Sequence, residues 1–230
     1  MNKEGFTLAE VLITLGIIGV VAAITLPTLI AKHQKQVFYT QFRKAASQLE
    51  NALKMYEIDN GCEGNISNCF TNENYSIPVF DIKFTNKFSK YFKISNEINE
   101  NNYNEICKNY DTKLGYATRE TLEYNNCRPE SDFQGNLTGF ITTDGVLYFL
   151  ASDDGAAGGY LMDINGPIKG PNTRGRDVYL FYLRTNKGLV WGGNESKAFE
   201  DFHPDGNIEC TENNGDGCAA KLLQEGKMNY

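Results

Sequence analysis

The chain opens with a long apolar run that follows a short polar segment. From Phe6 to Ala31 the sequence holds 26 residues, and the only charged side chain among them is that of Glu10. A helix of this length can cross a hydrocarbon core of about 30 Å with some tilt. The pattern therefore predicts one membrane-spanning helix near the start of the chain, with a single carboxylate inside it.

After the apolar run, apolar residues recur at steps of 4, 3, 4, 3 and 4, the spacing of one buried face of a helix. The residues on this stripe are Phe38, Phe42, Ala45, Leu49, Ala52 and Tyr56. Asn60-Gly61 is then expected to end the helix, with a residue in the left-handed conformation as its C-terminal cap. We expect one helix from Phe6 to about Ile58, roughly 80 Å long at 1.5 Å per residue. The stripe could pack on a globular head formed by the rest of the chain, or it could form the seam of a coiled coil. Because the stripe is short, packing on a head is favoured.

Alternating apolar residues in the second half of the chain predict an antiparallel sheet. The expected strands are Leu137 to Thr143, Val146 to Ala151, Tyr160 to Ile164, Val178 to Thr185 and Leu189 to Trp191. Asp144-Gly145 is expected to form a two-residue hairpin turn between the first two. A sheet of four or five strands needs one covered face, and the amphipathic part of the long helix can cover it.

Three shorter segments complete the predicted head. Phe84, Phe88 and Phe92 follow a helical spacing, which predicts a short helix from about Thr85 to Phe92. The segment from Asn96 to Asn104 is expected to be a surface loop. The tail from Cys218 to Tyr230 is expected to form a short helix and then an edge strand.

Glu10 needs a positive partner, because a charge at the centre of a membrane helix costs about 2.5 to 3.5 kcal/mol. A cut after Gly5 would create an amine on Phe6, four residues before Glu10 and one helical turn away. The hexapeptide Gly5-Phe6-Thr7-Leu8-Ala9-Glu10 resembles the cleavage and methylation motif of type IV prepilins and type II secretion pseudopilins.

The resemblance implies a leader of residues 1-5, a membrane and assembly helix at 6-31, an amphipathic continuation at 32-60 and a globular head at 61-230. It implies an α+β pilin-like fold, in which the long helix packs by its C-terminal half on an antiparallel sheet. A prepilin peptidase would cut after Gly5 and methylate Phe6, and Glu10 would pair with the amine of a neighbouring subunit. Pro27 falls where helices of this family often kink.

By the same resemblance the chain is a structural subunit of a type IV pilus or a type II secretion pseudopilus. It would sit in the bacterial inner membrane by a single span, with its head exported to the periplasm or cell surface. A platform protein and a cytoplasmic ATPase would polymerise it with other pilin-like subunits. The alternative is a minor or tip pilin, or a membrane-anchored binding module whose ligand the sequence does not identify.

A secretory signal and a plain single-pass anchor compete with a prepilin helix as accounts of the apolar run. A secretory signal could be cut after Val21-Ala22-Ala23, but such a signal has an apolar core of only 7 to 15 residues. A plain anchor would leave Glu10 neutral, near the surface or paired within its own chain. Glu10 and the length of the run favour the prepilin motif.

Composition and charge argue against an enzyme and against a nucleic-acid partner. The net charge of -7 opposes a broad electrostatic grip on nucleic acid or anionic lipid. His33 and His203 have no nucleophile at a recognisable spacing, and Gly155 to Gly159 lacks the strand-loop-helix context of a phosphate cradle. We expect no catalytic residue and no cofactor.

Six cysteines lie in the expected exported head, which predicts disulfides in an oxidising compartment. They are Cys62, Cys69, Cys107, Cys127, Cys210 and Cys218. Six cysteines permit 15 full pairings, and proximity alone favours pairing each with its neighbour in sequence. A structural zinc site is not expected, because the sequence contains no Cys-x2-Cys zinc-knuckle motif and only two histidines.

A connection rich in Asn, Gly and Pro links two of the expected strands, between Asp163 and Asp177. Its composition is explained by turn geometry alone. Asp163, Asn165 and Asp177 are also hard oxygen donors of the kind that calcium prefers, although their spacing is not that of an EF-hand. We therefore commit to no metal site in this loop.

Overall fold

The computed structural model describes residues 5, 7–62, 64, 69, 82–99, 101–102, 105–106, 139–151, 159–184, 188–191, 210 and 217–230. The chain divides into two compact units, Met1–Val37 and Phe38–Tyr230. Helix α1, Leu8–Asp59, begins in the first unit and ends in the second.

In the first unit, α1 exposes nearly all of its apolar side chains. By length and composition this helix is able to cross a membrane. Its hydroxyl side chains are satisfied within the helix: Thr14 donates to the carbonyl of Glu10, Thr25 to that of Val21, and Thr28 to that of Thr25. Such bonds remove the cost of a free polar group in hydrocarbon. Pro27 lies inside α1, and a kink there stays a prediction.

In the second unit, α1 buries the predicted stripe. Phe42, Ala45, Leu49, Ala52 and Tyr56 are buried as expected, and Ala46 and Leu53 join them. The predicted left-handed cap at the end of this helix is confirmed, because Gly61 has a φ of 68°. The N–H of Gly61 donates to the Ile58 carbonyl, and the N–H of Cys62 donates to the Glu57 carbonyl. These two bonds form a Schellman motif, which satisfies carbonyls at the helix end.

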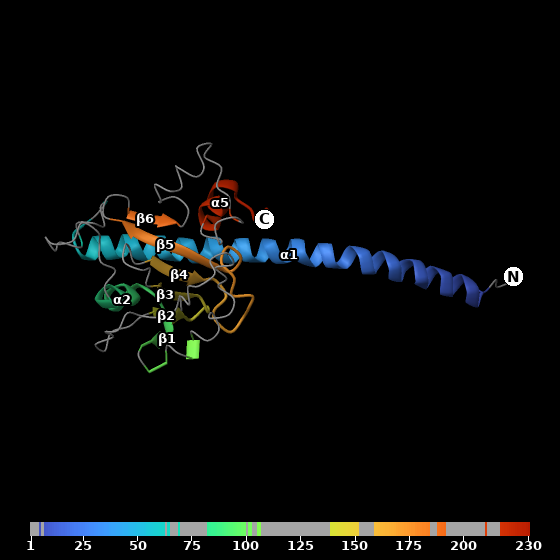
Figure 1. Ribbon diagram of the computed structural model, residues 1–230, viewed down its shortest axis with the longest axis horizontal. Coiled ribbons are helices and arrows are strands. Elements are labelled where there is room, and N and C mark those ends of the chain that lie inside the picture. The colour runs from blue at the N-terminus through green and yellow to red at the C-terminus, as the bar shows by residue number, and fades with distance from the viewer. Residues whose placement is uncertain are drawn as a thin grey trace, which may run out of the picture. The chain divides into compact units, whose positions relative to one another are not determined.

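The sheet of the second unit is an antiparallel meander in which each strand pairs with the next in sequence (Figure 1). Its strands are β1 (Ile94–Ile98), β2 (Gly139–Thr142), β3 (Leu147–Ala151), β4 (Gly159–Asp163), β5 (Val178–Arg184) and β6 (Gly188–Trp191). The order β1-β2-β3-β4-β5-β6 contains no crossover. The five strands expected from sequence are therefore confirmed, with ends shifted by at most two residues.

Side chains alternate between the two faces of the sheet, as a strand period of two requires. One face packs with the α1 stripe into the main core, through Phe140, Tyr148, Tyr160, Met162, Tyr179, Phe181 and Trp191. The opposite face forms a second, smaller cluster of Ile98, Leu147, Phe149, Leu161, Val178 and Leu180. The amphipathic half of α1 is thus the cover that the sheet was expected to need.

Short helices complete the second unit. The predicted helix near Thr85 to Phe92 is present as α2 (Ile82–Phe88) followed by the 3-10 turn η2 (Ser89–Tyr91), and Phe92 is already extended. The predicted C-terminal helix is α5 (Cys218–Glu225), which buries Ala219 and Leu222. Its C-cap, Gly226, is left-handed, with a φ of 68°.

The structure corrects four expectations. The sheet has six strands and not four or five, because Ile94–Ile98 forms the additional strand β1. The surface loop expected from Asn96 to Asn104 therefore begins only after Ile98. β1 lies at an edge and contains a bulge between Ile94 and Asn96, so three of its five residues face solvent and the apolar alternation is lost.

The turn between β2 and β3 is longer than expected. The N–H of Thr142 donates to the Val146 carbonyl, which leaves three residues in the loop, with Gly145 at a φ of 89°. A three-residue loop that ends on a left-handed glycine is a common alternative to the two-residue turn. At the C-terminus no edge strand follows α5; the tail instead buries Met228 against the main core.

Candidate functional site

The residues that the sequence predicts for processing and assembly lie at the start of α1. Gly5 and Thr7 precede the helix, Glu10 lies in its first turn, and Phe6 lies outside the described residues. The main-chain N–H and the hydroxyl of Thr7 both donate to Glu10 Oε2, at 2.8 Å each. The N–H of Glu10 in turn donates to Thr7 Oγ1 at 3.3 Å.

This reciprocal arrangement is a capping box, in which an N-cap Thr and a Glu three residues later satisfy each other's backbone N–H groups. The Glu10 carboxylate therefore already has a partner within its own chain, besides any amine on Phe6. The sequence carries the signal as Thr7-x-x-Glu10, but a carboxylate in an apolar run points first to a charged partner, so the cap was missed.

Gly5 is exposed, and a Cβ added to it would meet nothing within 4 Å. No packing within the described chain requires glycine at this position. If glycine is needed here, the requirement comes from a molecule that binds the segment, as close backbone access by a peptidase would demand.

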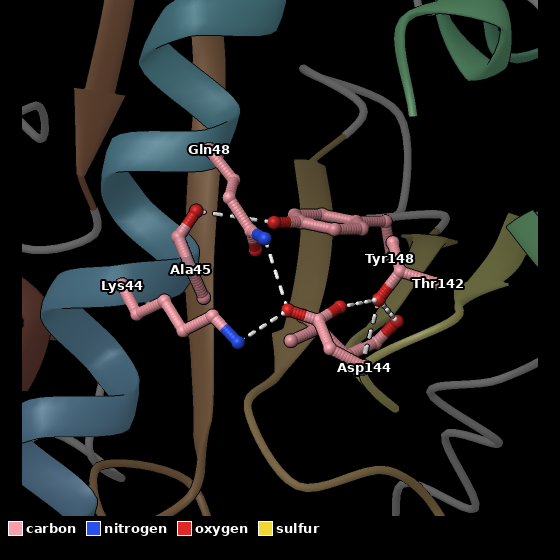
Figure 2. A network of polar contacts seen from close by, with 7 residues as sticks. Lys44, Ala45, Gln48, Thr142, Asp144 and Tyr148 are labelled. Carbon is pink, nitrogen blue, oxygen red and sulfur yellow. Dashed lines mark hydrogen bonds and ion pairs between the residues drawn. The ribbon is translucent and has the colours of Figure 1, made fainter. Parts of the chain in front are cut away.

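A second polar site joins α1 to the β2–β3 turn within the second unit (Figure 2). Lys44 Nζ lies 2.7 Å from Asp144 Oδ2, and Gln48 Nε2 donates to the same oxygen at 2.9 Å. Thr142 Oγ1 donates to Asp144 Oδ1 at 2.6 Å. Nearby, the buried Tyr148 hydroxyl donates to the Ala45 carbonyl at 3.1 Å. We call Lys44, Gln48, Thr142 and Asp144 the helix clasp.

The clasp favours the ionised form of Asp144. Burial tends to raise the pKa of this carboxyl, but hydrogen bonds from Lys44, Thr142 and Gln48 outweigh burial and hold its pKa well below the ordinary value of 3.8. The Asp144 side chain is 26% exposed, so solvent screens part of this interaction.

The clasp predicts a loss of stability at acid pH. A carboxyl whose pKa is lowered on folding stabilises the fold above its unfolded pKa, so its contribution is full near neutral pH and declines as pH falls below about 4. We expect Asp144→Asn to cost about 1 kcal/mol at pH 7 and to flatten the acid limb of stability. Thermal unfolding of the full chain in detergent between pH 2 and 7 measures both. Glu97→Gln, the same kind of change at an exposed site, is the control. If Asp144→Asn lost stability at acid pH as steeply as the native chain does, this result would contradict the clasp.

The β4–β5 connection is pinned by two buried carboxylates. Asp177 accepts the backbone N–H groups of Asn172 at 2.8 Å and Thr173 at 2.7 Å, and the Asn165 amide at 3.4 Å. Asp163 accepts the N–H groups of Asn165 and Gly166, at 3.0 and 2.9 Å. Burial raises the pKa of Asp177, while the bonds from Thr173, Asn172 and Asn165 oppose the rise.

The predicted oxygen donors of this loop therefore lie close together, but hydrogen bonds within the loop use both carboxylates. Among the residues that the structure describes, no group of three His, Cys, Asp or Glu side chains is arranged to hold a metal ion. The observed bonding is that of a loop organised by its turns.

Disulfides join Cys62 to Cys69 and Cys210 to Cys218, the pairs that proximity favoured. The third expected pair, Cys107 with Cys127, lies outside the described residues, as do His203 and Gly155 to Gly158. His33 is exposed on α1.

Comparison with known proteins finds matches over part of the chain. A prokaryotic N-terminal methylation motif matches residues 1–26. The chain is 41% identical over 62 residues to type II secretion system core protein G of Escherichia coli (strain K12), and 39% identical over 62 residues to the protein of the same name from Aeromonas hydrophila. Each alignment covers 26% of this chain, and 40 and 41% of the two relatives respectively. No solved structure matches the chain.

The apolar helix α1 and the sheet beneath its second half form a pilin-like α+β fold, and the methylation motif lies at the start of the chain. Its partial similarity is to a type II secretion pseudopilin.

Proposed function

We propose that the chain is a subunit of a type IV pilus or a type II secretion pseudopilus, cut by a prepilin peptidase after Gly5 and methylated on Phe6. The processed chain is held in the inner membrane by α1 until a platform protein and an ATPase polymerise it with other pilin-like subunits. The observation that carries this proposal is the match of the methylation motif to residues 1–26, over an apolar helix whose only acidic residue in the span is Glu10.

The geometry at Glu10 supports a role for this carboxylate in assembly. Thr7 holds it by two hydrogen bonds but supplies no positive charge. A neutral cap therefore keeps the carboxylate anchored in the isolated subunit, while its charge stays available to an amine of a neighbouring subunit. In hydrocarbon such a pair is far stronger than at a protein surface.

A set of three variants tests the charge separately from the cap. Glu10→Gln keeps a side chain able to complete the capping box but removes the charge, Glu10→Leu removes both, and Thr7→Val removes the hydroxyl but keeps the charge. We expect all three to insert in the membrane, and both Glu10 variants to yield at least about tenfold less sheared filament than the native chain. Thr7→Val should assemble in larger amount than either.

The measurement is the ratio of sheared to membrane-bound protein in cells that produce the full chain. Native filament yield from Glu10→Gln would reject the charge pairing, because the cap alone would then suffice. The abundance of the native chain in the sheared fraction also separates a major subunit, which dominates it, from a minor or tip subunit, which is scarce.

A further inference from the structure

Two exposed surfaces of the second unit combine apolar side chains with opposite charge. The first, which we call the loop tip, consists of Ile168, Lys169 and Arg176 in the β4–β5 connection. The second, which we call the helix end, consists of Met55, Glu57, Ile58 and Asp59 in the last turns of α1, of which Glu57 is half-buried and the other three are exposed. Neither surface is used by the processing residues or by the helix clasp.

The loop tip presents an apolar side chain on a firmly held loop. Ile168 is 91% exposed, the highest value among the large apolar residues of the described chain. Asp163 and Asp177 fix the loop on both sides of it through backbone N–H groups. Because both carboxylates are buried, the exposed charges of the tip are those of Lys169 and Arg176. The tip is therefore a positive surface, on a loop held by backbone hydrogen bonds, in a chain whose net charge is -7.

The helix end has the complementary character. Met55 and Ile58 are 54 and 59% exposed, and their spacing of three residues places them on one side of α1. The last turn of α1 contains no basic residue, whereas Glu57 and Asp59 lie there. These carboxylates add to the negative end of the helix dipole, an arrangement that a cation at this end would stabilise. Tyr91 donates a hydrogen bond to Asp59 at 2.9 Å but brings no positive charge.

The two surfaces lie at opposite ends of the part of α1 that the sheet covers. At the loop end, the Arg176 guanidinium lies 5.8 Å from the centre of the Phe38 ring. Met55 follows Phe38 by 17 residues in α1, which corresponds to about 26 Å along the helix axis. Figure 1 shows the β4–β5 connection near the point where α1 enters the sheet region, and the last turns of α1 beyond the far side of the strands. A single copy cannot close this contact on itself.

We infer that the loop tip of one copy docks on the helix end of the next copy, with Ile168 against Met55 and Ile58, and Lys169 near Glu57 and Asp59. This inference rests on the proposed function as a polymer subunit. A contact between different surfaces at opposite ends is heterologous, and repetition of such a contact builds an open head-to-tail filament. Charge complementarity fixes the direction in which the copies stack.

Site-specific photo-crosslinking in cells tests the contact on the full chain. A photoreactive amino acid in place of Ile168 is expected to give a dimer whose crosslinked peptide contains residues 55–59. The same amino acid in place of Gln224, an exposed residue of α5, is the control and should give no such peptide. Lys169→Glu should lower the dimer yield about two- to fivefold, and Asp59→Lys added to it should restore the yield. Lys93→Glu makes the same charge change at an exposed site outside both surfaces and should leave the yield unchanged.

The outcomes separate this contact from the proposed function. If filaments form while the Ile168 probe joins other residues or none, the docking contact is overturned and the subunit role stands. If neither filaments nor dimers form, both are overturned. A dimer mapped to residues 55–59 in a chain that never forms filaments would support the contact and reject polymerisation. Failure of Asp59→Lys to rescue Lys169→Glu would remove the charge pairing from the contact.

Discussion

A chain with Gly5→Trp is expected to keep its leader and accumulate in the membrane as the uncut precursor. A Cβ at position 5 meets nothing within 4 Å in the described part of the chain, so we expect the substitution to leave α1 and the sheet unchanged and its effect to fall on the protease that must reach this backbone. Intact mass of the purified protein measures the result. The native chain should lose residues 1-5 and gain one methyl group on Phe6, whereas the variant should show neither change.

Gly16→Trp is the matched control, because a Cβ at position 16 likewise meets nothing within 4 Å among the described residues, and the substitution introduces the same bulky side chain. It should be cut and methylated at the native site. Loss of the leader from Gly5→Trp would reject the assigned cleavage position, and a native protein that begins at Ile24 would show a secretory signal instead.

Asp177→Asn is expected to destabilise the second unit by about 3 kcal/mol, a larger loss of stability than we expect at the helix clasp. The native carboxylate accepts two backbone N–H groups on its two oxygens, from Asn172 and Thr173. An amide can turn its one oxygen to only one of them, so a buried N–H loses its partner and faces a second donor. The melting temperature should fall by about 6 to 12 °C.

Asp144→Asn, the same chemical change in the partly exposed helix clasp, supplies the comparison, with an expected cost of about 1 kcal/mol. Thermal unfolding of both full-length variants in one detergent measures the difference. Equal costs for the two variants would show that Asp177 does not organise the β4–β5 connection. Loss of the Ile168 crosslink in Asp177→Asn, with filaments retained, would connect this loop to the docking contact.

The sequence predicted the parts of the fold that depend on a regular period. The α1 stripe and the strands β2 to β6 follow from apolar residues at helical or alternating spacing, because each of these elements buries one face against the same core. β1 was missed because an edge strand with a bulge needs few buried residues, and Ser95, Asn96 and Glu97 all face solvent. The formation of an edge strand such as β1 depends more on pairing with its neighbouring strand than on apolar alternation in its own sequence.

The candidate sites were predicted as far as their chemistry is local. Gly5, Phe6 and Glu10 belong to one short motif and could be named together. The helix clasp could not, because Lys44 and Gln48 meet Asp144 only after about a hundred residues of chain have folded between them. The role of Asp177 as an acceptor of backbone N–H groups likewise depends on loop geometry that composition does not specify.

The order of the strands bears on how the proposed subunit would fold during export. Because each strand from β2 to β6 is hydrogen bonded to the strand before it, each segment exported under this proposal would find the template for its pairing already outside the membrane. Connections between sequence neighbours also shorten the search for native contacts, which favours rapid folding. The helix α5, tied down by Cys210 and Cys218, arrives last and packs on a sheet that is already complete. Export in chain order is therefore compatible with growth of the head one strand at a time, without waiting for its C-terminus.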